Sequence, residues 1–501
     1  MGIEKRNVAS TYCELHCVHG TWGTRETSGA GAVAHIQLEG FSHLSEEDIR
    51  ELERICGPED VLCSGPLLED YSHDEMLRVR GVPEAVVFPE TTGEVSSILR
   101  YASARKIAVT PRGSGTGLCG GAVPVFGGIV LCTTKMNKII EIDRENLTAT
   151  VEPGVLLLTL HETVEKLGFL YAPDPGEKTA TIGGNINTNA GGMRAIKYGV
   201  TRDNVRGLEV VLPSGEILEL GGKHAKNSTG YSLMNAFIGS EGTLGVVTRA
   251  VLKLLPLPRR TLSLLVPFDS LGEAIRAVPK VLSTGILPQS IEFAERNVIF
   301  AAERYLGKKF PHTGAPSYLL IRVDGNSVGE VTSMMEAIGD ACLEAGAIDV
   351  LIADTQERQK AIWDARGAFL AAIKSGNQVD ECDVVVPRDR IAELVEYTKI
   401  VSERTGVRIE SFGHAGDGNL HIYVIRDSIP DDEWEKRLEK AMDLLYEKGE
   451  ELGGLVSGEH GIGYAKRKYM LKNLSPGEIA IMRKMKAIFD PQGILNPGKV
   501  V

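Results

Sequence analysis

The sequence predicts an α+β fold with two domains. A β-α-β pattern over residues 85–110 leads into a loop that is dense in glycine. The pattern changes at residue 261, and two further β-α-β units follow in tandem, over residues 262–293 and 318–353. Tandem units of this kind fit a split β-α-β layer on an antiparallel sheet, so we expect a second domain to begin there.

The composition is that of an ordinary globular protein. The 501 residues are 43% apolar and 24% charged, enough for two or three domains with a sizeable core. The net charge of −12 argues against a nucleic-acid partner, and an acidic substrate would need a local cationic pocket. No apolar run is long enough to span a bilayer and no apolar leader occurs, so we predict a cytoplasmic protein without a transmembrane segment.

Residues 1–40 are expected to be an appendage, and a disordered one. They contain a tight group of potential metal ligands, Cys13, His16, Cys17 and His19, in a run rich in Gly, Thr and Ser without clear periodicity. This pattern favours a mobile tail over a metal site. The other cysteines lack CxxC spacing, which predicts reduced thiols and no iron–sulfur cluster.

The first folded region is predicted over residues 41–260. Capping boxes begin one helix at Ser45 and Asp48 and another at Thr91 and Glu94. Short apolar and β-branched runs predict strands, and a Pro-Ser-Gly turn joins the last two into a hairpin. The expected strands are residues 85–88, 107–110, 129–133, 139–143, 148–151, 208–212 and 217–220, with a helix over 157–167.

The stretch 111–124, PRGSGTGLCGGAVP, carries the first functional signal. Its glycines leave backbone N–H groups uncovered, and successive amides can then wrap a diphosphate, so a dinucleotide is the first hypothesis. The spacing Gly115-x-Gly117-x-x-Gly120 matches a nicotinamide-enzyme fingerprint, but Pro124 and two glycines stand where the required helix should begin. A surface glycine turn is the alternative.

Two further glycine-containing stretches follow, in which the backbone can approach a ligand closely. Residues 181–192, TIGGNINTNAGG, combine glycines with asparagines, whose amides suit the edge of a heterocycle or a ribose. Residues 239–245, GSEGTLG, are similar. A polar loop with turn asparagines is the alternative for the first of them. One elongated cofactor that touches three loops explains all three stretches together.

The second domain is predicted over residues 261–474, and residues 475–501 form a C-terminal helix and tail. After the tandem units, charged helices are expected over 355–374 and 388–405, and a strand over 408–412. The strongest chemical signal comes next, in His414-Ala-Gly-Asp-Gly-Asn-Leu-His421. On one straight strand these histidines would face opposite sides, but the Gly-Asp-Gly-Asn turn folds the chain back, so both imidazoles can point at one spot.

A third ligand is available in SGEHGIG, residues 457–463. His414, His421 and Glu459 would make a divalent-metal site with open positions, which is typical of a catalytic ion. His460 would remain unligated beside it as a general base near neutral pH. The alternative is that these are turn histidines bonded to the backbone.

Six motifs in order carry a family resemblance: PRGSGTGLCGG, PDPGEKTATIGGNINTNAGG, GSEGTLGVVT, GHAGDGNLH, SGEHGIG and LNPGK. From about residue 41 onward the chain resembles the FAD-linked 2-hydroxy-acid dehydrogenases, the group of the glycolate oxidase catalytic subunit, D-lactate dehydrogenase and D-2-hydroxyglutarate dehydrogenase. The resemblance implies a vanillyl-alcohol-oxidase-like architecture. It has a two-subdomain PCMH-type FAD-binding domain (41–260), a ferredoxin-like α+β cap with the metal site (261–474) and a C-terminal segment returning to the FAD domain (475–501).

The resemblance also implies roles for single residues. His414, His421 and Glu459 would bind the metal, with zinc favoured and iron or manganese as alternatives, His460 would be the base, and Arg366 would hold the substrate's carboxylate. FAD would be bound without a covalent link, because the glycine loop has no histidine. The FAD contacts would be Arg112, Gly113, Ser114, Gly115, Thr116, Gly117, Thr181, Gly184, Asn187, Gly191, Gly192, Glu241, Gly242, Val246 and Asn496.

The implied reaction is oxidation of a small D-2-hydroxy acid to the 2-oxo acid, with hydride transfer to flavin N5 and the metal polarising the substrate. In the hydroxyglutarate enzymes a lysine and an asparagine stand where this sequence has Glu381 and Tyr423. An acid in place of a carboxylate-binding cation favours D-lactate or glycolate over a dicarboxylate. D-2-hydroxyglutarate is the alternative.

Electrons must then leave the flavin, and the chain carries no iron–sulfur or haem ligands. The resemblance implies an electron-transfer flavoprotein, an iron–sulfur subunit or a quinone as acceptor, and a partner that would hold the protein at the membrane periphery. Oxygen is the alternative acceptor. Two other classes stay open, a metal hydrolase that uses the histidines and a flavin-binding electron-transfer subunit without catalysis.

Overall fold

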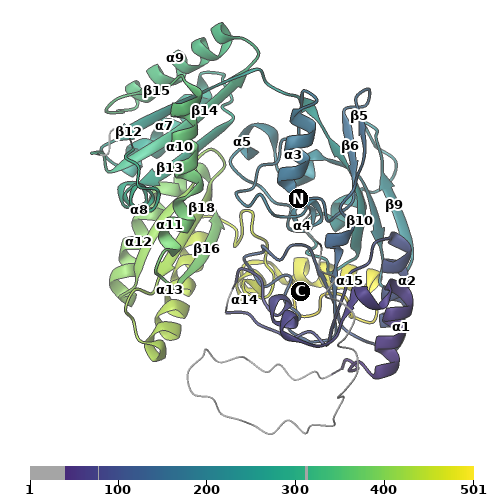
Figure 1. The fold of residues 1–501 in the computed structure, drawn as a ribbon. Helices are drawn as coiled ribbons and strands as arrows, with labels where there is room; N and C mark the ends of the chain where they lie inside the picture. Colours follow the sequence, from purple (N-terminus) through teal and green to yellow (C-terminus); the bar gives the residue numbers. More distant parts are fainter. Residues whose placement is uncertain (1–39, 77, 311–313) are drawn as a thin grey trace, which may run out of the picture. The chain divides into compact units, whose positions relative to one another are not determined.

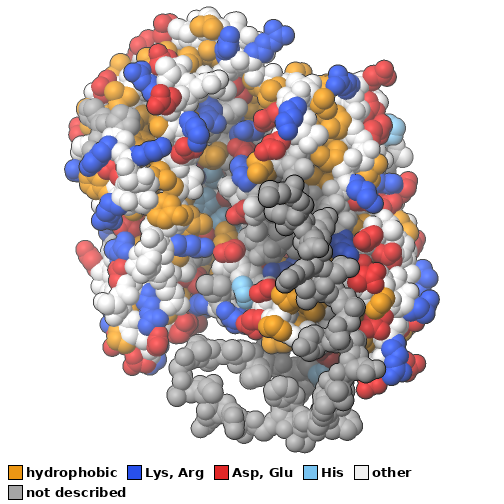
Figure 2. All heavy atoms as spheres, viewed as in Figure 1, with side chains coloured by type: hydrophobic (Ala, Val, Ile, Leu, Met, Phe, Trp, Pro, Cys, Tyr) orange, Lys and Arg blue, Asp and Glu red, His pale blue; other side chains and the backbone are white. Residues whose placement is uncertain are grey.

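The computed structural model describes residues 40–76, 78–310 and 314–501 (Figure 1). The predicted tail and its group of Cys13, His16, Cys17 and His19 lie outside the described residues. No helix in the described part is both long and apolar enough to cross a bilayer. On the face drawn in Figure 2, basic and acidic side chains are interspersed, and no large basic patch that would suit a polyanion is seen there.

A four-stranded sheet in the order β1-β2-β4-β3 presents the glycine loop at the end of β3 (Val109–Arg112). Strands β2 (Ala85–Val87), β3 and β4 (Ile129–Cys132) are parallel. Helix α2 (Thr92–Arg105) begins at the predicted capping box and packs its apolar face into the same core. Strand β3 starts and ends two residues later than predicted, so the loop begins at Gly113.

A five-stranded antiparallel sheet in the order β5-β6-β10-β8-β9 follows. The predicted hairpin is confirmed as β8 (Val205–Val211) and β9 (Ile217–Gly221), because the Pro-Ser-Gly turn reverses the chain between two apolar runs. Helices α3 (Leu157–Glu165) and α4 (Ile182–Thr188) bury apolar side chains against this sheet.

The end of the chain joins the core around the first sheet (Figure 1). Leu495 forms a parallel bridge with Val109 of β3, and the Asn496 N–H donates to the Val109 carbonyl at 2.7 Å. Ile494 and Leu495 are fully buried in the cluster that also contains β2, β3 and α2. The prediction that the C-terminal segment returns to the first domain is therefore confirmed.

A seven-stranded antiparallel sheet makes up the second half, in the order β15-β12-β14-β13-β17-β18-β16. The first four strands come from the two predicted β-α-β units, and their interleaved order is that of a ferredoxin-like layer. The sheet is extended by β17 (Arg408–His414), β18 (Asn419–Ile425) and β16 (Val379–Val385). Long helices, α7, α9, α12 and α13, cover one face, and α8, α10 and α11 cover part of the other.

Several elements differ from the sequence predictions. Residues 182–188 form helix α4 rather than part of a loop, because the Thr181 hydroxyl caps its start at the Gly184 N–H and Asn189 adopts the left-handed conformation at its end. The single helix expected over 355–374 is two, α10 (Gln356–Gly367) and α11 (Phe369–Lys374). Strands β10 and β16 and helices α8 and α13 were not predicted.

The domain boundaries at residues 41, 261 and 475 stay predictions. The elements not bounded above are α1 (Glu46–Cys56), η1 (Pro58–Asp60), β1 (Val61–Leu62), η2 (Pro66–Tyr71), η3 (Thr133–Lys135), β5 (Ile139–Asp143), β6 (Thr148–Val151), β7 (Phe169–Leu170), α5 (Ala195–Tyr198), η4 (Thr201–Asn204), α6 (Met234–Phe237), β10 (Val246–Lys253), β11 (Leu255–Pro256), β12 (Arg260–Phe268), α7 (Leu271–Ser283), β13 (Ser290–Glu295), α8 (Arg296–Leu306), β14 (Ser317–Gly325), α9 (Val328–Glu344), β15 (Leu351–Ala353), η5 (Arg388–Arg390), α12 (Ile391–Thr405), α13 (Asp431–Glu451), α14 (Arg467–Asn473) and α15 (Pro476–Phe489).

Candidate active site

The β17–β18 hairpin brings the two histidines of the sequence motif together. In its register Phe412 faces His421 and His414 faces Asn419, so the two histidines are diagonal neighbours on one face of the sheet. Their Nε2 atoms lie 3.4 Å apart, and both side chains are almost fully buried. The glycine turn between the strands therefore closes a hairpin and brings the two imidazoles together, as predicted.

Glu459 completes the group from the turn after α13. Its Oε1 lies 3.7 Å from His414 Nε2 and 3.3 Å from His421 Nε2. Its other oxygen, Oε2, is buried and has no hydrogen-bond partner in the described part of the chain. A buried carboxylate beside two imidazole nitrogens is expected to bind a cation. The donor set thus fits a divalent metal.

Each of these histidines is backed by a second carboxylate. His414 Nδ1 donates to Glu292 of β13, 2.8 Å from both oxygens, and His421 Nδ1 donates to Glu381 of β16 at 3.0 Å. A carboxylate that accepts from one ring nitrogen leaves the lone pair of the other free for a metal. The two carboxylates therefore orient both rings with Nε2 toward Glu459, where a metal would be bound.

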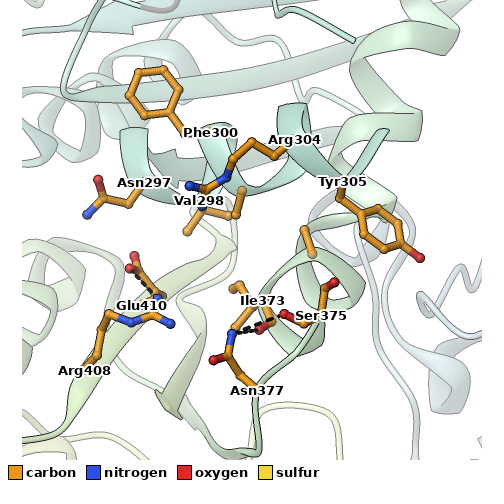
Figure 3. Close-up of a pocket in the computed structure, with 12 residues that line it drawn as sticks. Asn297, Val298, Phe300, Arg304, Tyr305, Ile373, Ser375, Asn377, Arg408 and Glu410 are labelled. Carbon is orange, nitrogen blue, oxygen red and sulfur yellow. Dashed lines mark hydrogen bonds and ion pairs between the residues drawn. The ribbon is translucent and has the colours of Figure 1, made fainter. Parts of the chain in front are cut away.

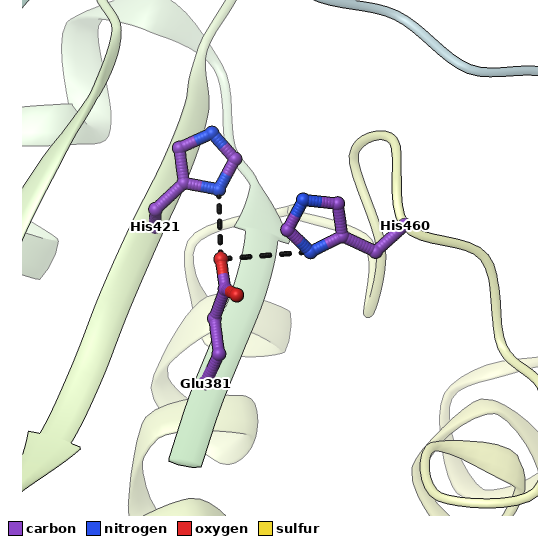
Figure 4. A group of neighbouring side chains, drawn as sticks. All are labelled: Glu381, His421 and His460. Atoms are coloured by element: carbon purple, nitrogen blue, oxygen red, sulfur yellow. Dashed lines mark hydrogen bonds and ion pairs between the residues drawn. The ribbon is translucent and has the colours of Figure 1, made fainter. Parts of the chain in front are cut away.

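A second candidate group, Glu381, His421 and His460, shares one histidine with the first (Figure 4). Here Glu381 Oε1 lies 3.0 Å from His421 Nδ1 and 3.5 Å from His460 Nδ1, and it also accepts from the Tyr423 hydroxyl at 3.0 Å. These contacts are satisfied by ring N–H donors without an ion. Of the two groups, His414, His421 and Glu459 therefore fit a metal better, and Glu381 orients the rings.

His460 lies beside the metal group, as the sequence predicts for a base. Its ring stacks on His421 with centroids 5.1 Å apart, and its Nε2 is 3.4 Å from Glu459 Oε1. Burial lowers the pKa of His460, but the charges of Glu381 and Asp383 outweigh it and raise the pKa to about 9. A divalent cation held by Glu459 would oppose this shift and move the pKa back toward neutrality.

Asp383, which the sequence did not single out, anchors the 457–463 turn. It is fully buried and accepts from the backbone N–H of His460 at 3.1 Å and from the Ser457 hydroxyl at 2.7 Å. The buried Lys466 ammonium donates to it at 2.9 Å. Although burial opposes ionisation, Lys466 and the neighbouring histidines hold the pKa of Asp383 well below its usual range. This carboxylate positions Glu459 and His460 through their backbone.

Arg366 lies next to the metal group but already has an anionic partner. Its Nε donates to Glu292 Oε2 at 2.8 Å, and its Nη2 lies 2.6 Å from the same oxygen. The guanidinium also lies 4.7 Å from the centre of the Phe412 ring. Glu292 thus joins Arg366 to His414, a link that no sequence motif indicated.

The glycine loop has the features of a phosphate site. None of the backbone N–H groups of residues 114–118 donates to another described residue, so five successive amides are open. Gly115 has φ +78°, and a Cβ there would lie 2.1 Å from the Arg112 guanidinium. That guanidinium donates to the carbonyls of His73 and Asp70, so a cofactor contact at Arg112 would fall to its backbone. Ser114 Oγ donates to the Thr179 carbonyl at 2.8 Å, and Thr116 and Gly117 are half-buried.

The other two glycine stretches bind to one another and to the site. Asn187 Oδ1 accepts from the Gly242 N–H at 2.9 Å, and Asn496 Nδ2 donates to the Glu241 carbonyl at 2.7 Å. The Glu241 carboxylate accepts hydrogen bonds from the backbone N–H groups of Ile462 and Gly463, both at 2.7 Å. Val246 begins β10 directly after this stretch.

Residues 191 and 192 connect the predicted cofactor region to the metal group. A Cβ on Gly191 would lie 3.1 Å from Glu459 Oε2, and one on Gly192 would lie 2.2 Å from the Asp174 carbonyl. At residue 192 only glycine permits this close approach to the backbone, and at residue 191 a Cβ would press on the Glu459 side chain. The predicted FAD contacts and the predicted metal ligands therefore meet at Gly191.

A pocket of about 440 Å³ opens between α8, α11 and β17 (Figure 3). Arg304, Asn297, Arg408 and Glu410 line it, and none of the predicted site residues does. It lies at the opposite end of β17 from His414, so the metal group does not belong to it.

We expect Gly113→Ala to weaken FAD binding about tenfold, a loss of ~1.4 kcal/mol. A Cβ at this position would lie 2.1 Å from Thr181 Oγ1 and would push the loop away from the start of α4. The measurement is the flavin absorbance of the purified protein and a titration of the apoprotein with FAD. Gly367→Ala, where a Cβ meets nothing within 4 Å, is the matched control. Unchanged affinity in Gly113→Ala would argue against this loop as the binding element.

Comparison with known proteins identifies the family. Residues 83–221 match an FAD binding domain, and residues 257–500 match the C-terminal domain of FAD linked oxidases. A D-lactate dehydrogenase of Anaerostipes hadrus is 46% identical over 467 residues, which cover 92% of this chain and 98% of that protein. The chain belongs to the FAD-linked oxidases. This confirms the predicted family and overturns the alternative of a metal hydrolase, because the matched FAD domain contains the first two glycine stretches.

Other FAD-linked oxidases are similar over nearly their full length. The glycolate oxidase subunit GlcD of Bacillus subtilis (strain 168) is 43% identical, with 91% of this chain and 97% of that protein covered. The mitochondrial D-2-hydroxyglutarate dehydrogenase of Bos taurus is 33% identical, with 93% and 85% covered.

Solved structures confirm the fold class. A p-cresol methylhydroxylase with bound substrate superposes with a TM-score of 0.76 at 20% identity, covering 90% of this chain and 96% of that chain. The 4-ethylphenol oxidase from Gulosibacter chungangensis gives 0.75 at 22% identity, covering 92% and 98%. At this identity the likeness shows the α+β architecture of vanillyl-alcohol-oxidase-like flavoproteins and nothing about substrate.

Proposed function

We propose that this FAD-linked oxidase converts a small D-2-hydroxy acid to the 2-oxo acid, with D-lactate or glycolate as substrate. The observation that carries the proposal is the convergence of His414, His421 and Glu459 beside His460, next to the glycine stretch predicted to hold the cofactor. Relatives named D-lactate dehydrogenase and glycolate oxidase subunit support the substrate class.

In this proposal residues of the chain bind the substrate and remove the proton of its hydroxyl group. When bound, FAD supplies the acceptor for the hydride that leaves C2, and the metal supplies a Lewis acid that acidifies the hydroxyl, with zinc favoured over iron or manganese. His460 accepts the hydroxyl proton at Nε2, while Glu381 holds its Nδ1 side. Arg366 contributes to carboxylate binding from the part of its guanidinium that Glu292 does not occupy.

Glu381 supports a monocarboxylate substrate. This side chain is buried between His421, His460 and Tyr423, and the Asp383 carboxylate lies near by. A second substrate carboxylate on this side would meet two negative charges in a poorly solvated place. D-2-Hydroxyglutarate, the substrate in the name of one relative, is therefore the second choice.

The test is anaerobic addition of D-lactate, glycolate and D-2-hydroxyglutarate to the FAD-containing protein, followed by flavin absorbance. We expect D-lactate or glycolate to bleach the flavin. His460→Ala should slow bleaching about 10²–10⁴-fold, the usual contribution of a general base, and keep its FAD. His43→Ala, at a side chain that is 69% exposed, is the control. Full activity of His460→Ala would refute the base, and a flavin that no 2-hydroxy acid bleaches would refute the proposed reaction.

The electron acceptor is proposed to be a protein, either an electron-transfer flavoprotein or an iron–sulfur subunit, or else a quinone. The described thiols are scattered singly over the fold and form no cluster site. Steady peroxide release in air at the rate of substrate oxidation would instead identify oxygen as the acceptor.

A further inference from the structure

Two half-buried arginines near the metal group have buried nitrogen atoms to which no described residue hydrogen-bonds. Arg322 of β14 has a buried Nε without a hydrogen-bond partner, and Arg194, just before α5, has a buried Nη1 without one, while its Nε makes an ion pair with Asp174. Buried guanidinium groups are normally paired, so unused donors of this kind need a partner that the chain does not supply.

Both arginines border the candidate active site. In the sheet, Arg322 faces Ser290, Leu320 faces Glu292, and Glu292 faces His414. Arg322 therefore lies diagonally next to Glu292, on the same face as the metal-binding histidines. Arg194 comes shortly after Gly191, where a Cβ would lie 3.1 Å from Glu459 Oε2. The charge of Arg194, together with burial, lowers the pKa of Arg322 to about 10. The two guanidinium groups are thus electrostatic neighbours.

The carboxylates around this pair are already engaged. Asp174 lies 3.1 Å from Arg194 Nε and also pairs with Lys178. Asp324 pairs with Lys197 and accepts from the Tyr198 hydroxyl and from Gln289. Glu292 binds His414 and Arg366, as described above.

The local charges do not balance, and the imbalance is positive. Three carboxylates face five cations, which are Arg194, Arg322, Arg366, Lys178 and Lys197. On the other side of the metal group, Glu381, Asp383 and Glu459 face Lys466. The site is therefore cationic on the side of Arg322 and anionic on the side of Glu381.

The Arg322 side chain is held in place without a salt bridge. Its guanidinium lies 4.0 Å from the centre of the Trp363 ring, and Trp363 Nε1 donates to Ser263 Oγ at 2.9 Å. A guanidinium stacked on an aromatic ring keeps its edge free for a planar anion. This preorganised edge suits a carboxylate.

We propose that Arg194 and Arg322 form an anion subsite that binds the carboxylate of the 2-hydroxy acid. Arg366 is neutralised by Glu292, so this pair supplies the net positive charge that the substrate's carboxylate requires. The inference rests on the proposed function for the identity of the anion. It adds that the substrate lies across the site, with its carboxylate toward Arg322 and its hydroxyl toward His460.

The test uses oxalate, a carboxylate ligand that cannot be oxidised by hydride loss, and the FAD-containing protein. Oxalate binding is followed by its perturbation of the flavin spectrum and by the shift it causes in the unfolding midpoint. We expect Arg322→Gln to raise the Kd for oxalate about tenfold or more and Arg322→Lys to recover part of the loss. Arg194→Gln should act in the same direction. Arg304→Gln, on the exposed surface of α8, is the control and should change nothing.

Two further readouts separate the outcomes. Glycolamide, in which a neutral amide replaces the carboxylate, should bind Arg322→Gln and the unchanged protein alike. The unfolding midpoint without ligand should not fall in Arg322→Gln, because a buried charge without a salt-bridge partner is being removed. An unchanged Kd for oxalate in Arg322→Gln would overturn the subsite. A loss of FAD in place of oxalate affinity would also overturn it and assign the pair to the cofactor's phosphates.

Failure of the subsite is distinguishable from failure of the proposed reaction. If no 2-hydroxy acid bleaches the flavin but oxalate binding still depends on Arg322, the anion subsite is supported and the proposed reaction is refuted. If D-lactate bleaches the flavin with the same apparent Kd in Arg322→Gln and in the unchanged protein, the proposed reaction is supported and the subsite is refuted.

Discussion

Glu459→Gln is expected to remove the bound metal and to slow flavin reduction by D-lactate about 10³-fold, corresponding to ~4 kcal/mol of lost Lewis-acid stabilisation. Glu459 Oε1 lies within 3.7 Å of the Nε2 atoms of His414, His421 and His460, and Oε2 is buried without a partner. A neutral amide of the same size cannot supply the anionic ligand. The metal content of the purified variant and its anaerobic rate of bleaching measure the effect.

The control for this variant is Glu439→Gln, which changes a glutamate whose side chain is 66% exposed. It should keep both metal and rate. Prolonged dialysis of the unchanged protein against a chelator should reproduce the loss of rate seen in Glu459→Gln, and re-addition of zinc, iron or manganese should show which ion restores it. Unchanged metal content and rate in Glu459→Gln would contradict the assigned ligand set.

Asp383→Asn is expected to lower the free energy of unfolding by about 3–5 kcal/mol, the usual cost of removing one partner from a buried ion pair. The variant would leave the Lys466 ammonium, 2.9 Å away and almost fully buried, without its counter-charge. It would also weaken the bonds that hold the backbone of His460 and Gly458. Denaturant unfolding of the purified protein measures the change.

A second variant separates the charge pair from the anchoring of the turn. Asp383→Asn combined with Lys466→Met should recover most of the stability, because no unpaired charge remains. Its rate of flavin reduction should stay low, since the turn that carries Glu459 and His460 is still released. Equal stability of Asp383→Asn and the unchanged protein would show that the ion pair does not contribute in this way.

The metal ligands that the sequence predicted lie next to glycine turns, which can be recognised within a few residues of sequence. His414 and His421 are separated by a glycine turn that can only close a hairpin, and Glu459 lies in a short glycine-flanked run. Such turns can be predicted without knowledge of the tertiary structure, because a turn depends on residues that are adjacent in the sequence. The structure brings the three side chains together as expected.

The residues that the sequence missed act over long separations. Glu292 and Asp383 are strand residues, and each reaches its partners only because the sheet order places β13 beside β17 and β16 beside β18. Strand β16 was itself missed, because its three acidic residues, two of which face the site, break the apolar pattern that marks a strand. Helix α4 was missed because glycine and asparagine disfavour helices, whereas its cap and its packing outweigh that propensity.

The bridge between Leu495 and Val109 has a consequence for synthesis of the chain. The core around β3 is closed by Ile494 and Leu495, which are synthesised long after it, so the glycine-loop half cannot reach its final packing until those residues have been made. The seven-stranded sheet, whose strands are all encoded before residue 426, can assemble first. The first elements of the chain can therefore complete their packing only after the whole seven-stranded sheet has been synthesised, and a product terminated before residue 494 would lack the piece that completes them.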